Sequence, residues 1–512
     1  MRKLSIVVGL CILFLLLTSR STAMPPYPDS TGALAKTYVE ISQLIETDYG
    51  MTTQPIGQWH FLVICVDFDD KPFQTQLEFF DNLVFGDEFG AVNNFYTHNS
   101  YGKFLLDTHH LPSQLHVRAP KPYAYYVDGD YGFGPNRYTL VNDILDAIDS
   151  IVDFTEYINI GDTDILGVAI IHAGKGAERT RSPYDIWSHT GTINQVRDGT
   201  LIKRYTMTPE LYDIPGDMQP GIFVHELGHI LGLPDLYDRD GTSRPVGSWS
   251  VMGYGAWNGV PTGSSPANFD AWCKLQLGFV TPRVVETKES VVLQPIQKCD
   301  TVLMVRGPDE LSYYLLENRQ RVGYDAYAPW HGLLIWRIDE TRSDRTQWNN
   351  NEWYPGHETY GNYLLALIQA DNRWELERGR NVGDPMDPFP YERENADEFG
   401  PDTHPSSDWY NGEPTHLRVW NIKRSGENVT FSISVEAPTV ILEPEEPGCN
   451  QSFTGKIMMY NILGQKIGEF RGTCLNGNIQ FDSAALRCGS GIYFLRMTLG
   501  WNVYQRKIIV IR

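Results

Sequence analysis

The chain has 512 residues, of which 42% are hydrophobic, and a formal net charge of −21. A chain of this length exceeds what one hydrophobic core can serve, and it predicts about three domains. The negative charge argues against nucleic acid and anionic membrane surfaces as partners, and it suits a soluble extracellular protein.

Residues 1–23 have the features of a secretory signal peptide. Arg2 and Lys3 precede an apolar run from Leu4 to Leu17, and Ser21-Thr22-Ala23 supplies small residues for cleavage before Met24. The run is too short for a membrane span, and no later segment is as apolar as a span requires. We therefore expect a secreted or cell-surface protein without a transmembrane segment.

Residues 24–56 contain prolines and only a weak helical pattern around 33–46. We interpret this stretch as an N-terminal pro-segment or linker, and an ordinary surface arm is the alternative. Of the seven cysteines, Cys11 lies in the signal peptide. An exported protein can form disulfides, and we expect one between Cys474 and Cys488 because they flank a short strand.

Helices and strands alternate in the next segment, residues 57–283. Trp59–Phe68 is a continuous apolar run, typical of a buried strand, and the sequence from Val92 onward predicts helix, turn and strand. A helix is expected over Leu140–Ile151 and a strand over Ile165–Gly174. Helices around a small mixed sheet predict α+β architecture.

The stretch Gly221–Asp235 holds the side chains with the clearest chemistry. His225 and His229 are four residues apart, so on a helix they share one face and can bind one Zn²⁺. Glu226 is one step around the helix, from which its carboxylate can act as general base on a metal-activated water. The alternative is an amphipathic core helix whose histidines make only structural hydrogen bonds.

The residues after this helix extend the pattern. Gly232 can take a positive φ and end the helix, which allows Asp235 to return toward the histidines as a third ligand. Pro234 prevents helical continuation. The competing assignment is that Asp235 only caps the turn and that Asp238 or a later carboxylate completes the metal site.

Ser250-Val-Met-Gly-Tyr254 follows, and with the preceding motif it resembles the metzincin zinc peptidases. That resemblance implies a methionine turn under the metal at Met252 and a tyrosine, Tyr254, that helps to hold the metal or the tetrahedral intermediate. More closely, His225–Asp238, Trp249–Gly255 and the upstream Asn99-Ser-Tyr-Gly-Lys103 are similar to the immune inhibitor A family of secreted bacterial metallopeptidases. Taken alone, Met252 would more often be a packing residue.

The resemblance covers roughly residues 59–280 and implies a zincin/metzincin-like catalytic domain. In such folds the strand nearest the cleft binds the substrate as an added strand. Ile186-Trp-Ser-His189 resembles a family segment in this region, so it is a candidate for substrate contacts. The alternative is a packed Trp187 and a surface His189. Pro266–Gly278 has helical spacing and a glycine stop, and it is expected to close the domain.

Residues 284–436 contain seven short alternating segments, which predict a β-sandwich-like module. They are Ser290–Leu293, Thr301–Val305, Ser312–Asn318, Leu333–Asp339, Tyr363–Leu367, Leu417–Ile422 and Val429–Val435. Within this module Asp384 and Asp387 could supply oxygen ligands to Ca²⁺, although the segment lacks a full calcium-loop pattern. A solvated turn is the alternative.

The chain ends in a proline- and glutamate-rich linker, residues 437–450, and a small β-sandwich, residues 451–512. Asn461-Ile-Leu-Gly-Gln-Lys466 and Gly491-Ile-Tyr-Phe494 make this unit resemble the C-terminal domains that direct proteins to the type IX secretion machinery. An immunoglobulin-like accessory module is the alternative, since a fold does not specify its use.

Two classes of function follow from these patterns. The first is a secreted zinc endopeptidase that hydrolyses extracellular proteins or peptides. The second is a surface binding protein whose zinc site is only structural. Structural zinc sites usually have four protein ligands and do not need a glutamate beside the first histidine, so the first class is favoured.

Overall fold

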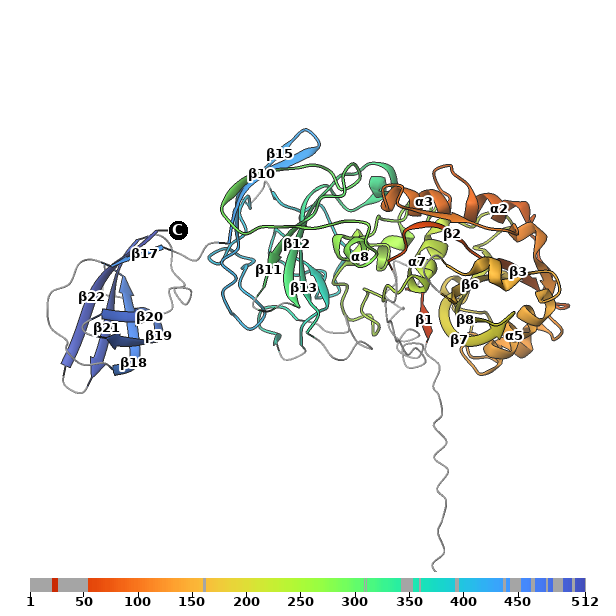
Figure 1. Cartoon of the computed structure of the whole chain (residues 1–512), viewed down its shortest axis with the longest axis horizontal. Helices are drawn as coiled ribbons and strands as arrows, with labels where there is room; N and C mark the ends of the chain where they lie inside the picture. The colour runs from red at the N-terminus through yellow and green to blue at the C-terminus, as the bar shows by residue number, and fades with distance from the viewer. Residues whose placement is uncertain are drawn as a thin grey trace, which may run out of the picture.

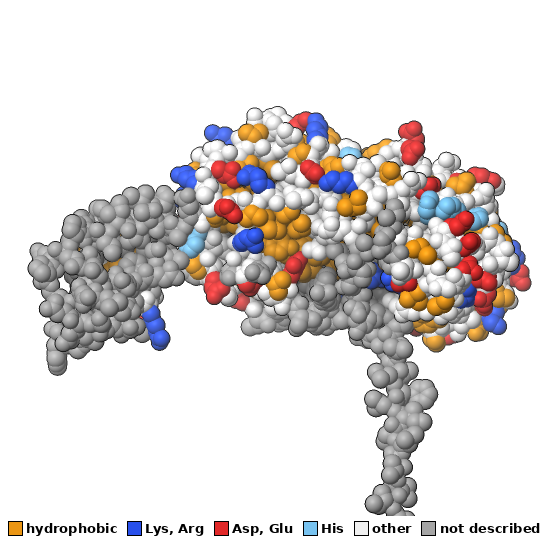
Figure 2. Space-filling view, in the orientation of Figure 1, with side chains coloured by type: hydrophobic (Ala, Val, Ile, Leu, Met, Phe, Trp, Pro, Cys, Tyr) orange, Lys and Arg blue, Asp and Glu red, His pale blue; other side chains and the backbone are white. Residues whose placement is uncertain are grey.

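A computed structural model describes the backbone of residues 21–25, 54–159, 163–307, 309, 311–341, 353–358, 361–391, 396–435, 439–442, 453–461, 466–475, 478–481, 491–499 and 502–511. Figure 1 shows the helices gathered around the N-terminal sheet, with the strands after α8 forming a separate β region beside them. On the face drawn in Figure 2, acidic side chains gather over the end that carries β3, β6 and α5, and basic side chains are scattered.

The central sheet of the N-terminal part has six strands in the order β1-β7-β8-β6-β3-β5. Strands β3, β5, β6 and β8 run parallel, whereas β7 is antiparallel to β8 and β1 is antiparallel to β7. Their bounds are Ser21–Ala23 (β1), Val63–Asp67 (β3), His116–Arg118 (β5), Ile165–Lys175 (β6), His189–Arg197 (β7) and Thr200–Leu211 (β8).

Both faces of this sheet are covered, which explains the continuous apolar runs of its strands. In β3, Val63 and Cys65 enter one hydrophobic cluster and Ile64 and Val66 enter the other. The first cluster includes the helices α2 (Glu78–Phe85), α3 (Val92–Asn99) and α7 (Pro220–Ile230). The second includes α4 (Tyr123–Val127) and α5 (Asn136–Ile148). The short α6 spans Ala177–Thr180.

Two predicted elements are corrected by the structure. The apolar run 59–68 is not one strand: β2 (Gly57–His60) pairs with β4 (Phe104–Asp107) in a separate two-stranded sheet, and β3 begins only at Val63. The connecting residues are buried too, so the apolar pattern hides the break. The helix expected over 266–278 is α8 (Ala271–Gln276), because the Asp270 carboxylate accepts a hydrogen bond from the Cys273 amide and caps it there.

The seven strands expected in residues 284–436 are present in two sheets, β10-β16-β15 and β14-β13-β12-β11-β9. The seven are Glu289–Leu293 (β10), Leu303–Arg306 (β11), Ser312–Arg319 (β12), Gly332–Asp339 (β13), Leu365–Leu367 (β14), Arg418–Ser425 (β15) and Asn428–Ser434 (β16), and a further short strand, Arg283–Val284 (β9), was not predicted. A third hydrophobic cluster draws on strands of both sheets, as in a β-sandwich.

The two parts of the chain share a core across the predicted boundary at residue 284. Side chains of β12 and β13, such as Leu315 and Trp336, belong to the same cluster as α7. The fully buried Arg319 donates to the Trp249 carbonyl at 3.1 Å and forms ion pairs with Glu317 at 2.8 Å and Asp325 at 3.0 Å. Removing one partner from such a buried network leaves an uncompensated charge. The β region therefore supports the segment around Trp249.

Among the described residues, the C-terminal strands are hydrogen-bonded in one six-stranded order, β17-β22-β21-β18-β19-β20, and the predicted small β-sandwich stays a prediction. Their bounds are Thr439–Leu442, Phe453–Asn461, Lys466–Leu475, Asn478–Phe481, Gly491–Leu499 and Asn502–Ile511 for β17 to β22. Residues 439–442, expected in the linker, pair with β22 because Thr-Val-Ile-Leu is a proline-free run of strand-forming residues.

The predicted disulfide and the weak helix at 33–46 lie outside what the structure describes, as do most of residues 1–56. Among the helices that it does describe, none combines the length and apolar character that a membrane crossing requires.

Candidate metal centre

Helix α7 presents the two histidines. Pro220 occupies its first position, where the missing N–H costs nothing, and all of its residues are buried. The helix ends at Ile230, and Gly232 takes a φ of +100°, which side chains other than glycine rarely adopt. The turn that follows brings Asp235 back toward the helix.

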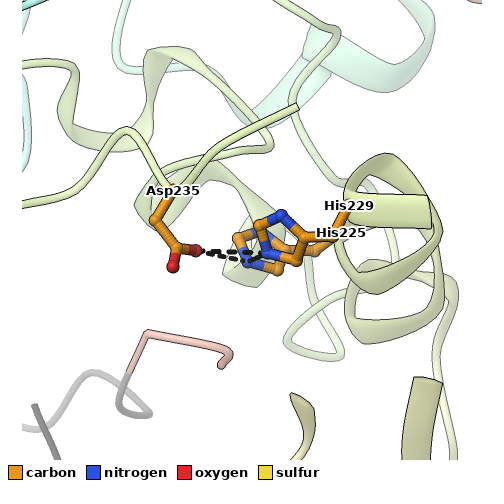
Figure 3. A group of neighbouring side chains, drawn as sticks. All are labelled: His225, His229 and Asp235. Carbon is orange, nitrogen blue, oxygen red and sulfur yellow. Dashed lines mark hydrogen bonds and ion pairs between the residues drawn. The ribbon is translucent and has the colours of Figure 1, made fainter. Parts of the chain in front are cut away.

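The structure places His225, His229 and Asp235 together (Figure 3), and they are the one group of metal-ligating side chains among the described residues. Asp235 Oδ1 lies 3.3 Å from His225 Nε2 and 3.2 Å from His229 Nε2. The two Nε2 atoms are 3.1 Å apart. All three side chains are almost fully buried.

Backbone carbonyls fix the orientation of both imidazoles. His225 Nδ1 is 2.8 Å from the Val251 carbonyl, and His229 Nδ1 is 2.8 Å from the Leu233 carbonyl. A carbonyl accepts only, so each Nδ1 carries the proton and each neutral ring turns the lone pair of Nε2 toward Asp235. Burial lowers the pKa of His229, which favours its neutral form.

The donor set fits a cation. Two imidazole lone pairs converge at one buried point with a carboxylate that accepts no hydrogen bond from the described residues, although Arg239 Nη2 lies 3.5 Å from its Oδ2. Burial alone would raise the pKa of Asp235, whereas positive charge on His229 and His225 and the Arg239 guanidinium, 3.5 Å away, hold the pKa below its usual range, so this carboxylate is stabilised by a positive neighbour. Converging acceptors repel one another unless a positive ion lies between them.

The methionine turn supports this arrangement from below. The Met252 carbonyl accepts a hydrogen bond from the Leu236 amide at 2.9 Å, next to Asp235. A Cβ on Gly228 would lie only 2.7 Å from Met252 Sδ, so the turn packs directly against α7. The competing candidate Asp238 accepts hydrogen bonds from Ser243 and is directed away from the histidines.

Glu226 lies beside this cluster without joining it. Its Oε2 accepts a hydrogen bond from Thr190 Oγ1 at 2.8 Å, and its Oε1 has no hydrogen-bond partner among the described residues. Burial raises the pKa of Glu226 well above its ordinary value, and the Thr190 hydroxyl offsets part of that rise. A buried carboxylate with one free oxygen is suited to taking up a proton.

The Tyr254 hydroxyl is hydrogen-bonded to Arg244, and a role for Tyr254 at the metal stays a prediction. A different tyrosine, Tyr237, stacks on the His225 ring at a centroid distance of 6.3 Å. Sequence reasoning missed Tyr237 and Thr190. The sequence feature that could have indicated Tyr237 was its position two residues after the predicted ligand Asp235. For Thr190 it was the position directly after the candidate substrate segment 186–189.

The proposed calcium ligands take part in a hydrogen-bonded turn. Asp387 accepts hydrogen bonds from the Trp249 indole at 3.0 Å and from the Asp384 amide at 2.9 Å. Asp384 accepts from Asn381 and from the Met386 amide. These contacts explain both carboxylates as structural groups, and calcium binding here stays a prediction.

His189 is buried, so the alternative that placed it on the surface is wrong. Its Nδ1 lies 2.7 Å from the Trp187 carbonyl and its Nε2 3.1 Å from the Tyr205 hydroxyl. Burial lowers the pKa of His189 to about 3. An unfolded histidine, with a pKa of about 6.5, binds a proton in a range where the folded one does not, so His189 weakens the fold as the pH falls below about 6.5.

We therefore expect His189→Gln to make the acid-induced loss of stability shallower, by up to about 1.4 kcal/mol per pH unit. Denaturant unfolding of the metal-free protein between pH 7.5 and pH 5 measures this slope. The same change at the exposed His404 is the control and should leave the slope as it is. Equal slopes for the parent and His189→Gln would contradict the assignment of His189 as a buried neutral group.

Comparisons with known proteins agree with the geometry. Residues 142–278 match the model of the immune inhibitor A peptidase M6 catalytic domain. Immune inhibitor A of Bacillus thuringiensis subsp. alesti is 30% identical over 238 residues, which are 38% of this chain and 34% of that protein. Pre-pro-metalloprotease PrtV of Vibrio cholerae serotype O1 is 36% identical over 118 residues, 20% of this chain and 13% of that protein. The chain thus matches only a minor part of each relative.

Proposed function

We propose that the chain is a zinc-dependent endopeptidase that hydrolyses extracellular proteins or peptides. The observation that carries this proposal is the convergence of His225, His229 and Asp235 at one buried point, with the unpartnered oxygen of Glu226 beside it. The match of residues 142–278 to a peptidase catalytic domain supports it. Zinc is the metal favoured by two imidazoles and one carboxylate in a catalytic site.

In this mechanism the two imidazoles and the Asp235 carboxylate would hold Zn²⁺. When bound, the ion would polarise the peptide carbonyl and make water a stronger nucleophile. Glu226 accepts a proton from the attacking water and later returns it to the leaving amine, which its raised pKa favours. Thr190 holds the other carboxylate oxygen, so that Oε1 stays directed toward the reaction.

The second candidate is a binding protein with a purely structural zinc. Only three protein ligands converge among the described residues, whereas structural zinc sites usually have four. Incubation of the purified protein with casein, followed by mass mapping of the products, decides between them. We expect internal cuts that a chelator prevents. Intact casein with zinc-loaded protein would favour the binding protein.

We also propose that the protein is exported by its N-terminal signal peptide and by a C-terminal sorting domain. The support is the apolar run 4–17 and the motifs in residues 451–512. Deletion of residues 451–512 should stop passage across the outer membrane and leave the peptidase active in lysate. Normal secretion of a chain that ends at Gly448 would favour an accessory role for the C-terminal sheet.

A further inference from the structure

Strand β1 lies on the free edge of the sheet next to the candidate metal centre. Ser21, Thr22 and Ala23 pair antiparallel with Gly191, Thr190 and His189 of β7. The Met24 amide continues the ladder by donating to the Ser188 carbonyl at 3.1 Å. In Figure 1 β1 lies next to α7, the helix that carries the histidines.

Three side chains from separate segments each contact one carbonyl, that of the last residue of β1 or of one of the two residues that follow it. The Tyr237 hydroxyl donates to the carbonyl of Ala23. The Trp187 indole donates to the carbonyl of Met24 at 2.9 Å, and the Trp257 indole donates to that of Pro25 at 3.1 Å. A strand that only covered a sheet edge would need no hydrogen bonds beyond those to β7. The three additional donors therefore form a groove that binds the backbone of an extended chain.

The Ala23–Met24 peptide bond lies at the end of this groove that is nearest the candidate metal centre. Its carbonyl is held by Tyr237, whose ring stacks on His225, and Thr190, the partner of Thr22, holds the Glu226 carboxylate. The side chains of Ala23 and Met24 are both fully buried in the cluster that contains α7. A charged side chain there would lose its hydration without gaining a partner.

We propose that β1 lies in the cleft as a substrate does, that Tyr237 is the catalytic residue that contacts the scissile carbonyl, and that the cleft takes extended peptides with a small residue before the cut and an apolar one after it. This inference rests on the proposed function. Hydrolysis adds the hydroxyl of water to the carbonyl carbon held by Tyr237 and a proton to the amide nitrogen that follows.

The test uses Tyr237→Phe, which removes only the hydroxyl, and as the matched control Tyr157→Phe, a buried tyrosine whose hydroxyl lies 2.9 Å from His110 Nδ1 and outside the candidate metal centre. The substrate is a quenched fluorescent peptide containing Ser-Thr-Ala-Met-Pro, and the protein is the exported chain, expected to begin at Met24. We expect the cut between Ala and Met. Loss of one donor to the developing oxyanion should lower kcat about 100-fold or more in Tyr237→Phe, with kcat nearly unchanged in Tyr157→Phe.

A second readout is independent of activity. Calorimetric binding of the same peptide to metal-free protein should weaken about 2- to 10-fold in Tyr237→Phe, as for one lost hydrogen bond, and at least about 10-fold when Asp replaces Met in the peptide. Unchanged kcat and binding in Tyr237→Phe, or an equal loss in Tyr157→Phe, would overturn the inference and leave the proposed function intact. Tyr237-dependent binding without hydrolysis by zinc-loaded protein would support the groove and overturn the proposed function.

Discussion

Replacement of Glu226 by alanine is expected to abolish most of the peptidase activity while about one zinc ion per chain stays bound. The carboxylate lies beside the three converging side chains and is held by Thr190 through one oxygen only. General-base groups contribute roughly 10²- to 10⁴-fold to rate, so kcat should fall by that factor. Casein hydrolysis and zinc content measured on the same preparation test this expectation.

Two further variants make the result specific to the position of the base. Glu226→Gln keeps the shape of the side chain and should be as inactive as the alanine variant. Glu178 is another buried carboxylate, but it accepts hydrogen bonds from Ser188 and is not aimed at the cluster. Glu178→Gln should therefore keep most of the activity. A zinc-loaded Glu226→Ala protein with parental activity would show that another group removes the proton.

Removal of the third ligand is expected to have the next largest effect. Asp235→Ala should weaken zinc binding by at least about 100-fold. Loss of a residue that only hydrogen-bonds a metal ligand already lowers metal affinity roughly 10- to 100-fold, and Asp235 is itself a proposed ligand. The carboxylate lies 3.2 to 3.3 Å from both Nε2 atoms, and two neutral imidazoles alone hold Zn²⁺ poorly. Competition against a fluorescent zinc chelator measures the dissociation constant.

The matched control is Asp238→Asn, three residues along the same loop. Asp238 accepts hydrogen bonds from Ser243 and Thr242 and does not face the histidines. Its variant should bind zinc nearly as tightly as the parent. If Asp235→Ala kept the zinc affinity of the parent and Asp238→Asn lost it, Asp238 would be the third zinc ligand. Asp235 would then only shape the turn.

Local spacing was sufficient to predict the elements that carry the site. The four-residue offset of His225 and His229 defines one helix face, and Gly232 takes the positive φ that ends the helix. The seven strands of the β region were also found, since alternation over short segments is a local signal. Both predictions depend on residues that are close in sequence.

Features that depend on distant contacts could not be predicted in this way. Nothing local to Trp59–Phe68 marks the break between β2 and β3, because the residues between them are buried as well. The start of α8 is set by Asp270, and the shared core across residue 284 is set by tertiary packing. The role proposed for Tyr237 depends on its contact with the Ala23 carbonyl, 214 residues away, and no spacing rule joins the two residues.

Restoration of activity by metal tests the central claim most directly. Chelator-treated protein is incubated with casein while Zn²⁺ is added in steps, and the rate is followed against the ratio of zinc to chain. The account predicts no hydrolysis without metal, a linear rise and a plateau at about one zinc per chain, the stoichiometry of a single three-ligand site. Hydrolysis that persists in metal-free protein, or that zinc does not restore, would contradict it.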